Sequence, residues 1–169
     1  ARFLLVGAAN PCPCGHEGEP TSRCRCSAAD ILRYRARLSG PLADRIDLHV
    51  RIGAVSLAAL GQMSREETSQ TIRTRVLAAR ERQAERYQVL PGVRQNAEAP
   101  GRWLQQHGAL APEARSLLAE VAERLRLSAR AFHRALRVAR TIADLDGEPL
   151  IAPGAVAEAL LFRGADSQG

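Results

Sequence analysis

Two closely spaced cysteine pairs near the amino terminus restrict the fold of this chain more than any other feature. They are Cys12-Pro-Cys14 and Cys24-Arg-Cys26, and they contain all four cysteines of the sequence. Two such pairs joined by a short loop can surround one ion with four thiolates, an arrangement that zinc favours. The sequence therefore predicts one zinc ion held by Cys12, Cys14, Cys24 and Cys26.

Four ordinary thiols and two disulfides are the alternatives to a metal site. Disulfides persist in oxidising compartments, and no secretory signal is visible in this sequence. Free thiols in a short polar loop would have no apolar core to cover them. His16 could replace one thiolate as a ligand, although its place in the loop favours a solvated side chain.

The segments on either side of the cysteines predict two short strands and one helix. Residues 3–9 are continuously apolar and end at Asn10, which is typical of a strand buried on both faces; a buried helical start is the competing interpretation. Ser27 and Asp30 form a capping box that begins a helix, and Gly40-Pro41 ends it. Apolar residues then alternate over Ile46–Ile52, which predicts a half-buried strand.

From Ser64 onward the sequence predicts a helical bundle. A capping box over Ser64–Glu67 begins the first helix, Ser128 caps a later one and Gly147 ends it. Residues 53–63 are expected to be a connector and residues 89–101 a loop. The expected helices run from Ser64 to about Tyr87, from Trp103 to near Gly108, from Pro112 to Leu125, from Ala129 to Leu145 and from about Pro153 to Phe162.

Composition excludes several classes of function. The chain has 169 residues, of which 46% are hydrophobic, and no apolar run approaches the ~20 residues of a membrane span. Its formal charge is +6, which suits nucleic acid or nucleotide without choosing between them. All 24 basic residues are arginine, which codon bias alone could explain. A phosphate-binding P-loop of the Walker A type needs a lysine, so this chain contains none.

Two long blocks resemble a known family. NPCPCG, CRC and RYRARLSGPLADRIDLHV, followed later by LSARAFHRALRVARTIADLDG, resemble the Mg-chelatase-like AAA+ ATPases of the YifB/ComM type. The resemblance implies a mainly α chain: the end of an α/β ATPase core over 1–52, a connector over 53–63 and a helical lid domain over 64–169. Because the chain lacks a P-loop and begins without Met, we expect it to be the carboxy-terminal portion of a longer ATPase.

The resemblance also implies three residues that act on nucleotide. Asn10 matches sensor 1, a residue near the γ-phosphate. Arg45 matches the arginine finger, which can raise the rate of phosphoryl transfer by ~10³–10⁵. Arg130 matches sensor 2 and lies in the first turn of a lid helix. The ordinary alternatives are a turn-forming asparagine, a surface ion pair of Arg45 with Asp44 or Asp47, and a solvated basic stripe that would also include Arg134 and Arg137.

For the intact protein the resemblance implies ATP and Mg²⁺ as cofactors, a hexameric ring, action on DNA such as branch migration during natural transformation, and a cytoplasmic location away from membranes. The alternative is a zinc-stabilised module that binds DNA or protein and has no nucleotide role. Arg45 and Arg130 separate the two hypotheses, because a pure binding module needs neither. A true metal chelatase subunit is disfavoured, since nothing in the sequence resembles a tetrapyrrole site.

Overall fold

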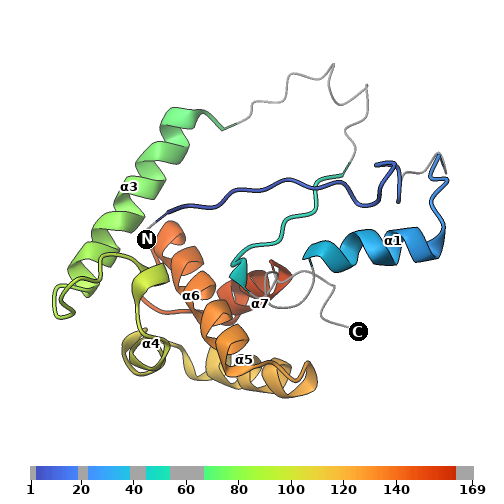
Figure 1. The fold of residues 1–169 in the computed structure, drawn as a ribbon. Coiled ribbons are helices and arrows are strands. Elements are labelled where there is room, and N and C mark those ends of the chain that lie inside the picture. Colours follow the sequence, from blue (N-terminus) through green and yellow to red (C-terminus); the bar gives the residue numbers. More distant parts are fainter. Residues whose placement is uncertain (1–2, 19–22, 39–44, 54–66, 163–169) are drawn as a thin grey trace. The chain divides into compact units, whose positions relative to one another are not determined.

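The protein is described from a computed structural model in which residues 3–18, 23–38, 45–53 and 67–162 are placed. The chain divides into two compact units (Figure 1). One consists of Ala1–Ile46 and Ile52–Val55, and the other of Asp47–Arg51 and Ser56–Gly169.

The first unit contains the cysteine loop and one short helix. Helix α1, Ala28–Arg35, continues into a single 3-10 turn, η1, Ala36–Leu38. The predicted cap is confirmed: the Ser27 hydroxyl oxygen accepts a hydrogen bond from the backbone N–H of Asp30, and the hydroxyl donates to the Asp30 carboxylate at 2.6 Å. No residue of α1 is fully buried, and an ion pair between Arg35 and Glu17 connects the helix to the cysteine loop.

The two predicted strands are wrong: no strand is assigned anywhere in the described ranges, and the chain is mainly helical. Phe3, Leu4 and Val6 are between 78% and 88% exposed, so the apolar run lies on the surface. A strand needs a neighbour to accept and donate its backbone hydrogen bonds, and the described part of the chain offers this run no such partner.

No strand is assigned over residues 46–52 either, and of the apolar residues that alternate there only Ile46 is half-buried. Leu48, Val50 and Ile52 are 51%, 64% and 90% exposed, whereas His49 is half-buried. His49 donates its backbone N–H to the carbonyl oxygen of Phe162 at 2.7 Å. The segment therefore contacts the end of the last helix instead of joining a sheet.

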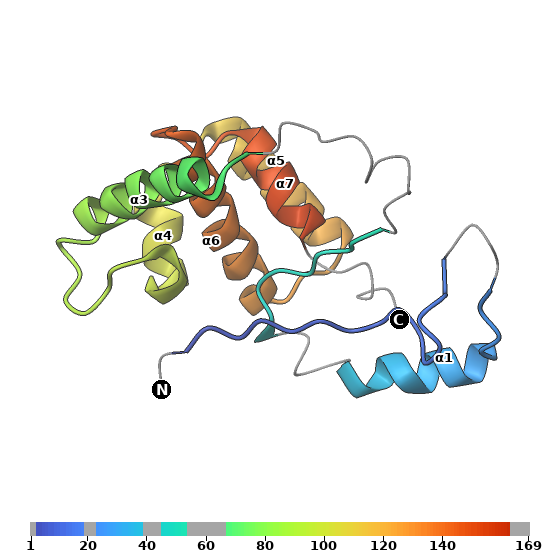
Figure 2. The same cartoon turned by 90° about the horizontal axis from the view of Figure 1, so that it is seen from above.

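The second unit is a bundle built around one long helix, α6 (Figure 2). Helix α6 contacts α3, α4 and α7, and four of its eight buried residues are alanines, whose small side chains let neighbouring helices approach closely. The bounds of the helices are Ser69–Arg86 for α3, Asn96–Glu98 for the 3-10 turn η3, Gly101–His107 for α4, Pro112–Arg124 for α5, Ala129–Asp146 for α6 and Pro153–Leu161 for α7.

Local sequence signals explain most of these boundaries. Ser128 caps α6 by accepting from the backbone N–H of Ala131, and Gly147 ends the helix with a left-handed φ of 80°, as predicted. Pro112 begins α5. The start of α3 differs from the prediction, because Thr68 is its cap. Ser64 lies outside the described residues, as do Gly40 and Pro41.

Candidate metal centre and predicted nucleotide-contacting residues

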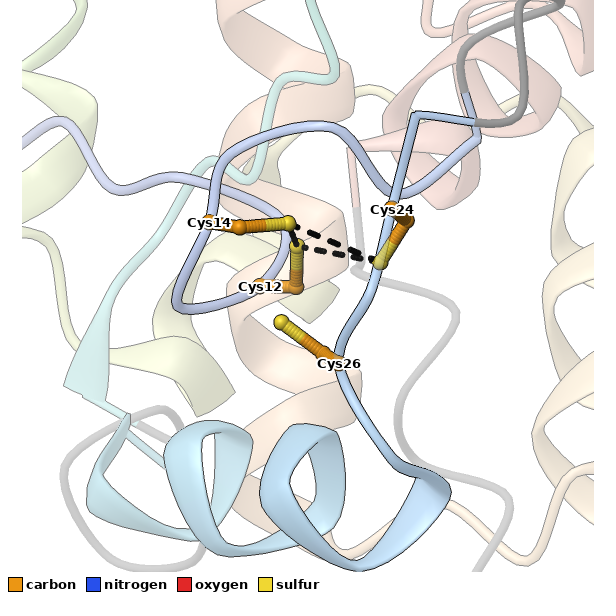
Figure 3. Close-up of side chains that lie close together, drawn as sticks. All are labelled: Cys12, Cys14, Cys24 and Cys26. Carbon is orange, nitrogen blue, oxygen red and sulfur yellow. Dashed lines mark hydrogen bonds between the residues drawn. The ribbon is translucent and has the colours of Figure 1, made fainter.

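The four cysteine sulfurs meet at one point of the first unit (Figure 3). The Sγ atoms of Cys12 and Cys14 are 3.3 Å apart, and the Cys24 sulfur lies 3.7 Å from the first and 3.6 Å from the second. With Cys26 included, all four lie within 4.8 Å of one another. The structure thus brings together the complete predicted ligand set.

A tight turn and a cap position the two pairs. Cys12 and Cys14 lie in a turn closed by a hydrogen bond from the Gly15 N–H to the Cys12 carbonyl at 3.0 Å, and Gly15 adopts a left-handed φ of 85° that glycine tolerates without strain. Cys26 lies directly before Ser27, the cap of α1. An ion pair of 2.7 Å between Arg35 and Glu17 joins the loop to the helix.

The donor set fits zinc. A tetrahedral zinc with Zn–S near ~2.3 Å places its sulfurs about 3.8 Å apart, close to the separations seen here. All four cysteines are free thiols; Cys12 is fully buried, Cys24 and Cys26 are half-buried and Cys14 is exposed. His16, the alternative ligand, is not a member of the cluster.

The thiols influence one another's ionisation. The pKa of Cys14 is lowered to about 6, first by a backbone hydrogen bond at His16 and then by its hydrogen bond with the Cys12 thiol. For Cys26, a backbone hydrogen bond at Cys14 lowers the pKa, but desolvation and hydrogen bonds with the other thiols raise it further, to about 12. The Cys14 thiolate therefore forms easily, whereas the raised pKa values of Cys24 and Cys26 oppose their ionisation. A bound divalent cation would favour the thiolate form of its ligands.

The predicted nucleotide-contacting residues lie on the surface of their units. Asn10 is exposed and its amide lies beside Gly15, so it adjoins the cysteine turn. Arg45 is also exposed. Arg130 is exposed at the second position of α6, where the free N–H groups of the first turn favour an anion. Asn10 and Arg45 belong to the first unit and Arg130 to the second.

Arg134 and Arg137, the other members of the possible basic stripe, both have partners in the structure. The side chain of Arg134 is only 13% exposed, and its Nε donates to the Asp47 carboxylate at 2.9 Å, so Arg134 makes an ion pair inside the second unit. Asp47 is one of the two acids that could pair with Arg45; the other, Asp44, lies outside the described residues. Arg137 donates to the Ala99 carbonyl at 3.1 Å and is half-buried.

Sequence reasoning missed a buried polar network between α3 and α6. The Asp144 carboxylate is fully buried and pairs with both Arg86 and Arg140, and the amide of Asn96 donates to it at 2.9 Å. The Arg86 side chain is only 18% exposed. A signal was available, because Arg140 and Asp144 are one helical turn apart within the apolar stripe of α6.

Arg140 itself has several carbonyl partners. Its guanidinium is fully buried and donates to the carbonyl oxygens of Gly108, Pro149 and Glu148 at 3.2, 2.9 and 2.6 Å. Arg140 therefore holds the residues that follow α4 and those that follow α6 close to each other. This role is structural, and neither Arg140 nor Asp144 is exposed to a ligand.

Comparison with known proteins finds two family matches, one after the other along the chain. Residues 1–60 match the family of the magnesium chelatase subunit ChlI, and residues 66–163 match the family of the carboxy-terminal part of that subunit. The chain belongs to the Mg-chelatase-like proteins of the YifB/ComM type. The cysteine loop of this family member lies in the first match and α3 to α7 lie in the second.

Individual relatives of this YifB/ComM-type chain align along nearly all of it. An uncharacterized protein of Mycobacterium tuberculosis is 43% identical over 163 residues, which is 96% of this chain and 32% of the relative. The uncharacterized protein YifB of Escherichia coli is 40% identical over 98% of this chain and 32% of its own length, and the competence protein ComM of Haemophilus influenzae is 40% identical over 96% and 31%. The chain thus spans about a third of the length of these curated relatives.

None of the helices in the described ranges is long and apolar enough to cross a lipid bilayer.

Proposed function

We propose that this chain is the carboxy-terminal portion of a cytoplasmic AAA+ ATPase motor that acts on DNA as a hexameric ring. The observation behind this proposal is the pair of adjacent family matches, which cover the chain in the order ATPase core and then carboxy-terminal domain. The family supports an ATPase that uses ATP and Mg²⁺, and one relative is named a competence protein, which supports a DNA substrate.

Within that motor, the chain supplies residues that sense or stabilise the nucleotide but not the phosphate cradle. With no lysine in its sequence, it has no P-loop of its own. Asn10 orients the attacking water as sensor 1, Arg45 contributes the guanidinium finger to a neighbouring subunit, and Arg130 contacts nucleotide from the lid as sensor 2. The exposed position of Arg130 in the first turn of α6 supports the last role, since helix amino termini favour anions.

We further propose that Cys12, Cys14, Cys24 and Cys26 hold one structural zinc ion. The convergence of four free thiols within 4.8 Å supports this assignment. All four zinc positions are then protein ligands, so the metal stabilises the loop and has no open position for catalysis. The division into core over 1–52, connector over 53–63 and lid over 64–169 belongs to the same proposal.

The experiment that tests this function is ATP hydrolysis by the intact protein with and without Arg130. Arg130→Ala should reduce ATP hydrolysis at saturating ATP strongly, whereas Arg115→Ala, which removes an exposed arginine from α5, should not. Equal rates for the two variants would favour the second candidate, a zinc-stabilised module that binds DNA or protein without nucleotide. The cysteine cluster is the observation that favours this second candidate.

A further inference from the structure

A hollow of about 610 Å³ lies between the cysteine loop and helix α1. The helical side presents Asp30, Arg33 and Tyr34 from α1, spaced at i, i+3 and i+4, together with Arg37 from the 3-10 turn η1 that continues the helix. The loop side presents Arg25 from between two of the proposed zinc ligands. The lining of the hollow includes Cys26, Arg25, Asp30, Arg33, Tyr34 and Arg37.

The charge of this hollow is positive, and two of its arginines have no acidic partner among the described residues. Asp30 is already engaged by the Ser27 hydroxyl and by Arg33, whose guanidinium lies 3.5 Å away. Within the described ranges, no carboxylate pairs with Arg25 or Arg37. Guanidinium groups recognise phosphate oxygens through paired hydrogen bonds, so these two side chains are suited to a phosphate-bearing ligand.

An aromatic ring stands between these cations. Tyr34 lines the hollow together with Arg33 and Arg37 and is half-exposed. An accessible ring beside arginines is a combination by which proteins hold single strands, since an unpaired base stacks on the ring while the cations contact the backbone. A base inside a duplex is already stacked on its neighbours and cannot use the ring.

We propose that this hollow, formed by Arg25, Tyr34 and Arg37, binds a single strand of DNA. The proposal rests on the proposed function in one respect, namely that the substrate is DNA. It adds a surface to that function: two phosphates contact Arg25 and Arg37 while one base stacks on Tyr34.

Zinc has a defined part in this site. Bound zinc with four thiolates adds two negative charges beside the hollow, so net charge alone would not favour DNA there. What the metal provides is position: Arg25 lies between the ligands Cys24 and Cys26, so a closed cysteine loop keeps it at the hollow that Arg33 and Arg37 also line. Binding of the strand should therefore require zinc even though zinc makes the unit less positive.

The test measures binding of a fluorescein-labelled oligothymidylate to the zinc-loaded chain by anisotropy, without nucleotide, over a series of salt concentrations. The variant Arg25→Ala/Arg37→Ala should weaken binding about tenfold or more, because it removes two charge-assisted hydrogen-bonding groups. The slope of log affinity against log salt should become shallower by about 0.7 for each phosphate that is no longer neutralised. Tyr34→Leu should weaken binding about fivefold or more, because the base can no longer stack on an aromatic ring.

The matched control is Arg23→Ala/Arg115→Ala, which removes the same charge from exposed residues that do not line the hollow. It should change affinity less than twofold. Arg25→Lys/Arg37→Lys should restore much of the binding, since lysine still meets phosphate as a point charge. Removing zinc with a chelator should abolish binding of the oligothymidylate at this hollow.

Four results would overturn the proposal. The first is equal weakening by the control pair, and the second is unchanged affinity in the Arg25→Ala/Arg37→Ala variant. The third is equal binding of a duplex together with no effect of Tyr34→Leu. The fourth is displacement of the strand by polyglutamate at equal charge, which would indicate a site for acidic protein. Because no nucleotide is present, these outcomes do not depend on whether the intact protein hydrolyses ATP.

Discussion

Arg86 and Asp144 form a bidentate ion pair across the bundle, with both guanidinium nitrogens bonded to a carboxylate that is fully buried. The pair joins the end of α3 to the last turn of α6. Arg82 adds a hydrogen bond of 3.0 Å to the Asp144 backbone carbonyl. The attachment of α3 to the bundle therefore depends on this carboxylate.

Replacing Asp144 by Asn should strongly destabilise the helical unit. The change keeps the volume but leaves Arg86 and Arg140 without a counter-charge, and breaking a buried ion pair costs about 3–5 kcal/mol. Urea denaturation followed by circular dichroism measures the free energy of unfolding. Asp146→Asn is the control, since Asp146 is exposed two residues away and should cost about 0.5 kcal/mol or less. Similar losses for the two variants would contradict the role given to the buried pair.

This network also shows where sequence reasoning ends. The helix boundaries at Ser27, Ser128 and Gly147 were predictable because caps and stops act over a few residues. Arg86 and Asp144 are 58 positions apart, and nothing local to Arg86 distinguishes it from a solvated arginine. The two predicted strands were wrong for a related reason: a strand depends on a partner elsewhere, whereas the apolar run of residues 3–9 and the alternation of residues 46–52 are only local patterns.

The cysteine site was predictable because its ligands are close in sequence. Two pairs separated by a short loop need only one turn and one helix cap to converge, and the structure supplies both. The hollow beside it was not predicted, because it depends on how the loop folds against one face of α1.

Zinc removal should loosen the cysteine loop far more than the helical bundle. We expect one zinc per chain in metal analysis of protein purified without chelator under reducing conditions. After chelation, amide hydrogen exchange over residues 11–26 should accelerate strongly, while α5 and α6 should change little because they pack in their own apolar core. Acid should release the metal, since protonation of the thiolates competes with zinc. A chelated sample with unchanged protection in the loop would exclude the structural role, provided that oxidation is ruled out.

The chain by itself should not hydrolyse ATP. It has no lysine and hence no P-loop, so Arg45 and Arg130 have no bound phosphates to act on. A phosphate-release assay on the purified chain should give the background rate, with or without DNA. Turnover that disappears in the Arg130→Ala variant would mean that this chain contains a complete ATPase site.

Arg45 provides the most direct test of the account, because its proposed role requires a neighbouring subunit. In the intact protein, Arg45→Ala should preserve folding and ATP binding but reduce hydrolysis by about 10³-fold or more, since the charge that it meets develops in the transition state. Arg45→Lys should also fail, because an ammonium cannot reproduce the guanidinium fork. Arg115→Ala is the control and should retain the wild-type rate.

The decisive measurement is ATP hydrolysis by mixed rings. Subunits with an inactive P-loop but an intact Arg45 are combined with subunits that have an intact P-loop but carry Arg45→Ala. If Arg45 acts across the subunit interface, the mixture should recover a measurable part of the wild-type rate, although each variant alone has almost none. If Arg45 instead pairs with an acid of its own chain, the mixture should show no recovery, and Arg45→Ala should cost only ~1 kcal/mol or less of stability.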